Sequence, residues 1–228
     1  IFLFANGIPA MKEIGFLDFL TGETWRPNND IYGIFPMIMG SIYVTAGAII
    51  VGVPIGILTS VFMARYCPKK IYPVLKSATE LLAGIPSVIY GFFGLVVMVP
   101  MIRNFGRTLR DMGIIETAGN GSSILTASLL LGMMILPTII GVTESAIRSV
   151  PQQYYEGALA LGATHERSIF RVIMPAAKSG VIAGIVLGVG RAIGETMAVI
   201  MVAGNQARMP AGLLKGVRTL TANIVIEM

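Results

Sequence analysis

PMIMGSIYVTAGAIIVGVPIGILTSVFMA, residues 36–64, is the stretch that decides the fold class of this chain. It lies in a segment with no charged residue between Asp30 and Arg65. A helix needs about 20 apolar residues to cross a bilayer, so the stretch predicts a membrane-spanning helix. Pro54 would bend that helix, which a helical membrane protein tolerates.

Three more apolar stretches follow along the chain. They predict further spans at residues 81–102, 122–142 and 181–203. The chain also opens inside an apolar run, residues 1–5, which we interpret as the end of a preceding span. The sequence therefore predicts an all-α, polytopic transmembrane helical bundle that forms a single domain over residues 1–228.

The composition supports this fold class and excludes several functions. Hydrophobic residues make up 54% of the chain and charged residues only 13%, too few for a soluble surface. The net charge of +5 comes from short basic runs between apolar segments, where lipid headgroups and not nucleic acid are the expected partner. A single cysteine and a single histidine predict neither an intramolecular disulfide nor a metal site, and we expect no cofactor.

Motifs of catalysis are also missing from the sequence. It contains no G-x-x-x-x-G-K-[ST] loop for ATP phosphates, no G-x-S-x-G elbow and no H-E-x-x-H helix. We therefore expect a protein that is not itself an enzyme.

The basic residues give a prediction of orientation. They are densest in the segments 65–78 and 147–178, which places these two segments in the cytoplasm by the positive-inside rule. The segments on the other side also carry basic residues, spread over longer loops. These could be ordinary solvated charges, or they could raise the local concentration of an anionic substrate.

Arg191 and Glu195 are the candidate substrate-pathway residues, because they fall within the predicted span 181–203. A charge at the centre of a membrane costs about 2.5–3.5 kcal/mol or more, and charged residues there commonly mark a pathway. The spacing of four predicts that both lie on one helix face, together with the small residues Gly180, Gly184 and Gly188. The alternative is an ion pair that only fixes helix packing.

The chemistry of this pair predicts an anionic substrate. Arginine offers a planar fork of donors that matches the oxygens of phosphate or carboxylate. The carboxylate of Glu195 can only accept hydrogen bonds, so it would repel fully deprotonated sulfate. Phosphate still carries a proton near neutral pH, and the pair would therefore favour phosphate.

The segment Pro151–Pro175 predicts a short helix, a glycine turn and a second short helix. Pro151 suits a helix start, Gly162 a position just after a helix end, and Thr164 the start of the next helix. Composition alone would describe an interfacial helical hairpin.

Residues 156–175, EGALALGATHERSIFRVIMP, resemble the EAA loop of ABC importer permeases. In that family the loop is a cytoplasmic coupling helix hairpin that docks on the ATPase subunit. The resemblance implies this coupling role for Glu156, Gly157, Ala158, Gly162 and Pro175. The chain departs from the usual pattern at Gly157, Val172 and Met174, and each change is a small or apolar exchange.

Three other segments narrow the resemblance: FLTGETWRPNND at 19–30, ELLAGIPSVIYGFFGL at 80–95, and GRAIGETMAV at 190–199 followed by Gly204-Asn205. They resemble the phosphate-specific (Pst) importer permeases, and the PstC type of subunit more than its PstA partner. The resemblance implies a bundle like that of type I ABC importers. Six spans would be expected, of which this chain lacks most of the first and all of the last.

The family resemblance implies an ATP-driven phosphate importer in the cytoplasmic membrane of a prokaryote. The expected partners are a PstA-like permease, two cytoplasmic ATPase subunits, an extracytoplasmic phosphate-binding protein and the lipid bilayer. Arg191 and Glu195 would belong to the polar positions of phosphate passage. Open alternatives are a permease for molybdate or sulfate, a secondary transporter or channel, and a membrane scaffold.

Overall fold

The structure is a computed structural model that describes residues 7–9, 11–12 and 14–227. Its described residues group into two compact units. The first unit takes its residues from Ile1–Gly47, Ser87–Leu130 and Glu195–Met228, and the second from Ala48–Pro86 and Leu131–Gly194. The apolar run at residues 1–5, interpreted as the end of a preceding span, lies outside the described residues.

Two long helices contribute residues to both units. They are α3 (Phe35–Val61), which continues as a π-helical segment Phe62–Tyr66, and α7 (Ile124–Ser149). Pro54 and Pro137 lie inside these helices without ending them. The predictions at 36–64 and 122–142 are therefore confirmed as helices.

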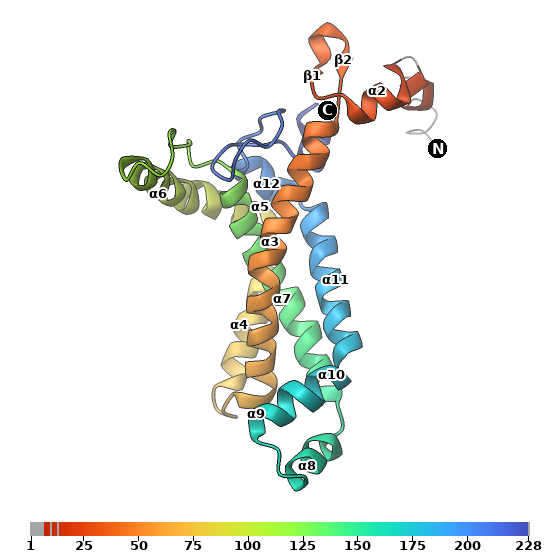
Figure 1. Cartoon of the computed structure of the whole chain (residues 1–228), viewed down its shortest axis with the longest axis vertical. Coiled ribbons are helices and arrows are strands. Elements are labelled where there is room, and N and C mark those ends of the chain that lie inside the picture. The colour runs from red at the N-terminus through yellow and green to blue at the C-terminus, as the bar shows by residue number, and fades with distance from the viewer. Residues whose placement is uncertain (1–6, 10, 13, 228) are drawn as a thin grey trace. The chain divides into compact units, whose positions relative to one another are not determined.

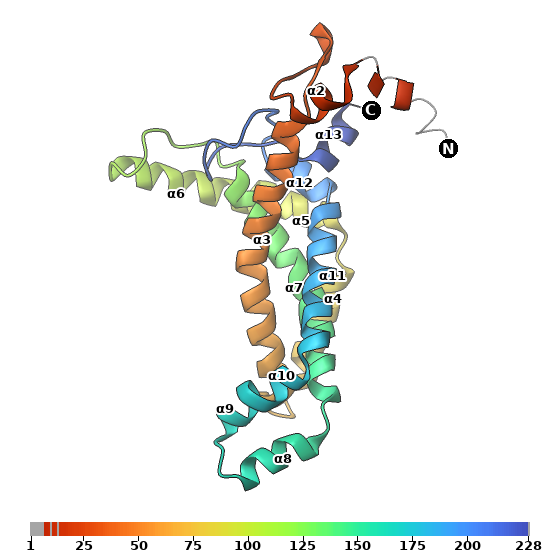
Figure 2. The same ribbon diagram turned by 45° about the vertical axis from the view of Figure 1, so that its right-hand side comes forward.

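The first unit combines short helices with a small hairpin. Its other elements are α2 (Phe16–Thr21), β1 (Trp25–Arg26), a 3-10 turn (Pro27–Asn29), β2 (Ile31–Tyr32), α5 (Ser87–Phe93), a π-helical segment (Gly94–Met98), α6 (Val99–Asp111), α12 (Met197–Val202) and α13 (Leu220–Ile226). The two strands pair antiparallel, with Trp25 opposite Tyr32. Helices α5 and α12 lie side by side (Figures 1 and 2), where Gly91 lets the backbone of Ala198 approach closely.

The second unit carries the predicted hairpin. Its other elements are α4 (Tyr72–Gly84), α8 (Gln152–Ala160), α9 (His165–Ser168), a π-helical segment (Ile169–Ile173), α10 (Met174–Ala176) and α11 (Lys178–Gly194). In Figures 1 and 2, α11 runs beside the second half of α7.

Three helices within the described residues are long and apolar enough to cross a membrane: Phe35–Tyr66, Ser87–Asp111 and Ile124–Ser149. A fourth candidate is a bent pair, His165–Ala176 with Lys178–Gly194, whose axes differ by 71°. The protein is therefore an α-helical membrane protein. The prediction of a continuous fourth span at 181–203 is wrong, because α11 ends at Gly194 and α12 starts anew at Met197.

The predicted span at 81–102 also has different bounds. Leu81 belongs to α4, which ends at Gly84, and the membrane-spanning helix starts at Ser87 and runs to Asp111. Pro86 explains the break, because its ring disfavours helical backbone at the preceding residue. Ile85 accordingly has extended backbone, with φ −69° and ψ 126°.

The glycine stripe of α11 packs as predicted. A side chain added at Gly184 would lie 2.7 Å from Oγ1 of Thr143, and one added at Gly188 would lie 2.8 Å from Cγ1 of Ile139. Both contact atoms belong to α7. Small residues at these positions let the two helix backbones approach, as is common in membrane helix packing.

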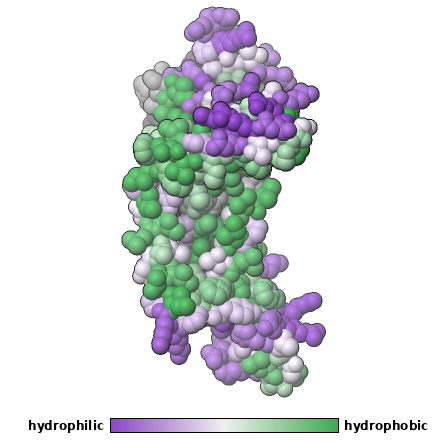
Figure 3. All heavy atoms as spheres, turned by 90° about the vertical axis from the view of Figure 1, so that its left-hand side faces the viewer, coloured by the Kyte–Doolittle hydropathy of each residue, from purple (hydrophilic) through white to green (hydrophobic). Residues whose placement is uncertain are grey.

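The surface of the molecule fits a lipid environment. Figure 3 shows that hydrophobic residues cover much of the face drawn. Large apolar side chains such as Ile50, Leu58 and Val186 are more than half exposed. Apolar exposure on this scale is rare on soluble monomers and is expected where lipid or another membrane subunit contacts a protein.

Candidate functional site

The hairpin begins with α8, which ends in a well-defined glycine cap. Gly162 has φ +83°, a left-handed conformation that glycine adopts without strain. Its N–H donates to the carbonyl of Leu159 at 2.9 Å, and the N–H of Ala163 donates to that of Ala158 at 3.1 Å. This pair of bonds is the Schellman motif, so the prediction that Gly162 lies just after a helix end is confirmed.

The second half of the hairpin starts at Thr164. The hydroxyl of Thr164 accepts a hydrogen bond from the N–H of Arg167 at 3.3 Å, which caps α9 as predicted. Tyr155 of α8 and His165 of α9 are hydrogen-bonded through the hydroxyl and Nδ1 at 2.7 Å. The ring of Tyr66 packs edge-on against His165, with ring centroids 4.9 Å apart. These contacts fix the two arms of the hairpin to each other and to the end of the α3 helix.

The hairpin is also anchored to α7 by a hydrophobic core. Ile169 and Ile173 of the hairpin are fully buried in a cluster with Ile147 of α7 and with Val150, which directly follows the end of α7. The hairpin and the end of α7 are expected to move together, because well-packed interiors have low compressibility and transmit strain. A displacement of the hairpin therefore acts directly on the end of α7.

The predicted coupling residues divide into a buried and an exposed set. Ala158 is buried, with 8% of its surface exposed. Glu156, Gly157, Gly162 and Pro175 are exposed.

The hairpin also exposes an apolar residue beside its glycine turn. Leu161 is 91% exposed at the end of α8, and sequence reasoning had given it no role. An apolar side chain projecting from a rigid turn suits contact with another protein. The signal was available in the sequence, because Leu161 directly precedes the turn glycine.

Arg191 lies in the last turn of α11, where a positive charge is favoured by the helix dipole. It is partly buried, and its Nη1 donates to Oγ1 of Thr138 on α7 at 3.4 Å. A guanidinium has five N–H donors, and this long bond uses one of them. The side chain is thus held by its neighbour and retains the donor fork that an oxyanion requires.

Glu195 lies beyond the end of α11, in the first unit. Its Oε1 accepts a hydrogen bond from the N–H of Ala198 at 3.2 Å, in the first turn of α12. The prediction that Glu195 shares a helix face with Arg191 is therefore wrong. Glycines at 188, 190 and 194 weaken the helix here, and the carboxylate satisfies an N–H that a new helix start leaves unpaired.

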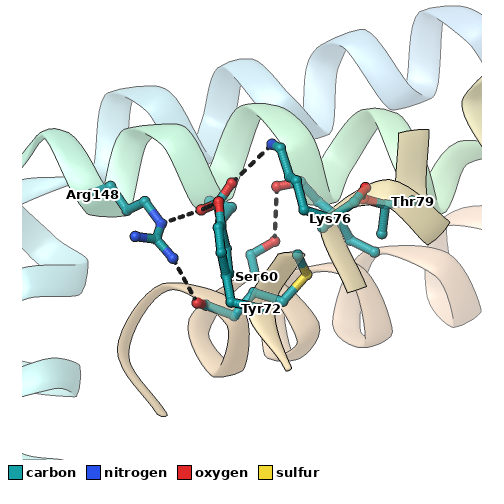
Figure 4. Close-up of polar contacts among 8 residues, drawn as sticks. Ser60, Tyr72, Lys76, Thr79 and Arg148 are labelled. Carbon is teal, nitrogen blue, oxygen red and sulfur yellow. Dashed lines mark hydrogen bonds and ion pairs between the residues drawn. The ribbon is translucent and has the colours of Figure 1, made fainter. Parts of the chain in front are cut away.

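A second group of charged residues was missed by sequence reasoning. Glu144 of α7 is a buried carboxylate, with 2% of its side chain exposed. It accepts hydrogen bonds from the Tyr72 hydroxyl at 2.9 Å and from Nζ of Lys76 at 3.2 Å, and it is ion-paired with Arg148 (Figure 4). We call Tyr72, Lys76, Glu144 and Arg148 the Glu144 cluster. Lys76 and Arg148 fall in the basic segments 65–78 and 147–178, which served only to predict orientation, and both lie on helices.

Comparisons with known proteins give matches over most or all of the chain. A family model described as "Binding-protein-dependent transport system inner membrane component" matches residues 52–225. A probable ABC transporter permease protein, YqgH of Bacillus subtilis, is 38% identical over 232 residues, which cover 100% of this chain and 72% of that protein. A phosphate transport system permease protein, PstC of Mesorhizobium japonicum, is 36% identical over 236 residues, with the same two coverages. Among solved structures, an amino acid ABC transporter with histidines gives a TM-score of 0.49 at 20% identity, covering 76% of this chain and 72% of that one.

Proposed function

The chain belongs to the family of inner membrane components of binding-protein-dependent transport systems, and from this we propose that it is a permease subunit of an ATP-driven phosphate importer. The observation that supports phosphate as the substrate is the similarity of this chain, along its whole length, to a protein named a phosphate transport system permease. The helical membrane fold and the capped hairpin agree with a permease of the ABC importer type.

The hairpin of residues 151–175 is the proposed site of coupling to the ATPase. Its two arms are fixed to each other, its inner side is packed on α7, and its tip exposes Leu161. A rigid element with an exposed apolar anchor is suited to insert into a partner's groove. We infer that ATP-driven movement of the ATPase subunits reaches the membrane helices through this hairpin.

The remaining parts of the importer come from partners. A PstA-like permease, two cytoplasmic ATPase subunits and an extracytoplasmic phosphate-binding protein would complete it. ATP hydrolysis belongs to the ATPase subunits in this proposal, and the complex resides in the cytoplasmic membrane of a prokaryote. This chain supplies a gated path and no covalent chemistry.

Arg191 and Glu195 are the proposed phosphate-contacting residues. Arg191 offers donors to the phosphate oxygens, and its weak bond to Thr138 is exchangeable for a charge-assisted one. Glu195 accepts a hydrogen bond from a protonated phosphate oxygen, which sulfate cannot provide. The acceptor at Glu195 therefore favours a protonated oxyanion.

Competition between anions tests the proposed substrate. Proteoliposomes that hold the full importer are loaded with ATP, and uptake of labelled phosphate is measured with a large excess of unlabelled sulfate or molybdate. Phosphate import predicts that only unlabelled phosphate competes. Strong competition by molybdate or sulfate would instead identify a permease for that oxyanion.

The Glu195→Gln substitution tests the basis of selectivity. Glutamine keeps the size of the side chain but can donate to an unprotonated oxygen, so we expect the preference for phosphate over sulfate to fall by about tenfold, the scale of one hydrogen bond to a charged group. The measurement is the ratio of the two uptake rates in the intact importer. An unchanged ratio would show that Glu195 has no part in discrimination.

A further inference from the structure

The Glu144 cluster is a buried set of charges that phosphate passage, as proposed above, does not use. A carboxylate buried in a membrane-spanning helix is costly unless it is paired. Glu144 is paired three times, by the hydroxyl of Tyr72, the ammonium of Lys76 and the guanidinium of Arg148. Neither oxygen of the carboxylate is left without a donor, so the group is held in one position.

The cluster joins α4 to α7. Tyr72 and Lys76 are one turn apart on α4, so both reach the same carboxylate on α7. The guanidinium of Arg148 also lies 4.1 Å from the centre of the Tyr72 ring, a cation–π contact between the same two helices. In Figure 4 the side chains of Arg148, Tyr72 and Lys76 converge from the two helices.

Apolar packing contributes little to the position of α4. None of its residues is buried, and Val74 and Leu81 are 68% and 73% exposed. The polar bonds to Glu144 are therefore a main attachment of α4 to α7 within the second unit.

The same end of α7 is attached to the hairpin and to α3. Ile147 of α7 lies about one turn beyond Glu144 and shares a buried cluster with the hairpin's isoleucines and with Val150, which follows the end of α7. Arg148 donates to the carbonyl of Met63 at 3.0 Å, and Arg65 donates to that of Ile147 at 3.0 Å. The turns of α7 that carry Glu144 and Arg148 thus receive any movement of the hairpin directly.

We propose that Glu144 is a positioning residue for energy coupling, which anchors α4 to α7 so that movement of the hairpin is passed on to α4. This inference rests on the proposed ATP-driven transport. It assigns Glu144 no contact with phosphate. Its loss uncouples ATP hydrolysis from transport and leaves the affinity for phosphate unchanged.

The Glu144→Gln substitution tests this role in the complete importer. Glutamine still accepts from Tyr72 but loses the charge that holds Lys76 and Arg148, whose side chains are 32% and 44% exposed and can turn to water. We expect phosphate imported per ATP hydrolysed to fall about tenfold, the scale of one lost charge-assisted hydrogen bond, at an unchanged KM for phosphate. Lys76→Met should lower the ratio in the same way, and the double variant should be no worse than Glu144→Gln. Glu80→Gln, an exposed carboxylate on the same helix, is the matched control and should leave the ratio unchanged.

If Glu144→Gln imports as much phosphate per ATP hydrolysed as the unaltered importer, the inference is overturned. Equal losses of transport and ATP hydrolysis would also overturn it, because they indicate a purely structural role. If Glu144→Gln does not assemble, Lys76→Met decides on the same criteria. Failure of the unaltered importer to move phosphate with ATP would instead count against the proposed function.

A distance measurement tests the anchor without any substrate. Spin labels at Val74 on α4 and Ser149 on α7, in a Cys67→Ser background of the full complex, should give a narrow distance distribution. Lys76→Met should broaden it. A distribution that Lys76→Met leaves unchanged would overturn the anchoring role.

Discussion

Replacing Arg191 by alanine is expected to lower ATP-dependent phosphate uptake by about a hundredfold, because two charge-assisted hydrogen bonds to the anion are lost together. The side chain is partly buried at the end of α11, and its described bond to Thr138 is long. The substitution should therefore leave the helix and the assembly of the importer intact. Uptake of labelled phosphate into proteoliposomes measures the effect.

Arg191→Lys and Thr138→Val are the informative controls. Lysine keeps the charge but loses the planar fork, so uptake should be intermediate. Thr138→Val removes only the 3.4 Å bond that holds the guanidinium and should cost much less than Arg191→Ala. Normal uptake with Arg191→Ala would return this arginine to a packing role.

Replacing Leu161 by aspartate is expected to abolish coupling. Leu161 is 91% exposed beside the Schellman turn, so the fold of the hairpin should tolerate the change. A charge placed at the centre of a docking contact should weaken association with the ATPase subunits by about a hundredfold, as loss of a hot-spot residue does. Co-purification of the ATPase subunits and phosphate uptake should be lost together.

Leu161→Met is the matched control, since it keeps an apolar side chain of similar size. It should retain both association and uptake. If Leu161→Asp binds the ATPase subunits normally and transports normally, the tip of the hairpin is not the docking site.

The sequence predicted most of the helices and the local structure of the hairpin. Long uncharged stretches identify membrane spans regardless of context, and Pro54 and Pro137 do not end them because a membrane helix tolerates a missing hydrogen bond. Gly162 and Thr164 carry strong local signals for a helix end and a helix start. Both were confirmed.

The breaks inside apolar stretches were harder to predict. Pro86 ends α4, although Pro54 does not end α3, and both prolines lie in stretches without a charged residue. Glu195 bonds to the start of α12 instead of continuing α11, which spacing alone does not reveal. Residue type alone does not predict which proline or glycine ends a helix, because membrane helices tolerate both.

The Glu144 cluster was missed for a different reason. Lys76 and Arg148 were used only as part of basic segments that indicate orientation, and their partner Glu144 follows the end of an apolar stretch. Tyr72 and Lys76 precede Glu144 by 72 and 68 positions along the chain. An acidic residue that closely follows a predicted span is nonetheless a signal that a cation lies near.

We propose that this chain forms part of an ATP-driven path for phosphate. The most direct test of this role is uptake of labelled phosphate into proteoliposomes that hold the chain with its permease partner, ATPase subunits and binding protein. Uptake is compared with and without ATP on the side of the membrane where the ATPase subunits lie. Uptake is expected only when ATP reaches the ATPase subunits. Uptake that proceeds equally without ATP would contradict it and identify a secondary transporter or channel.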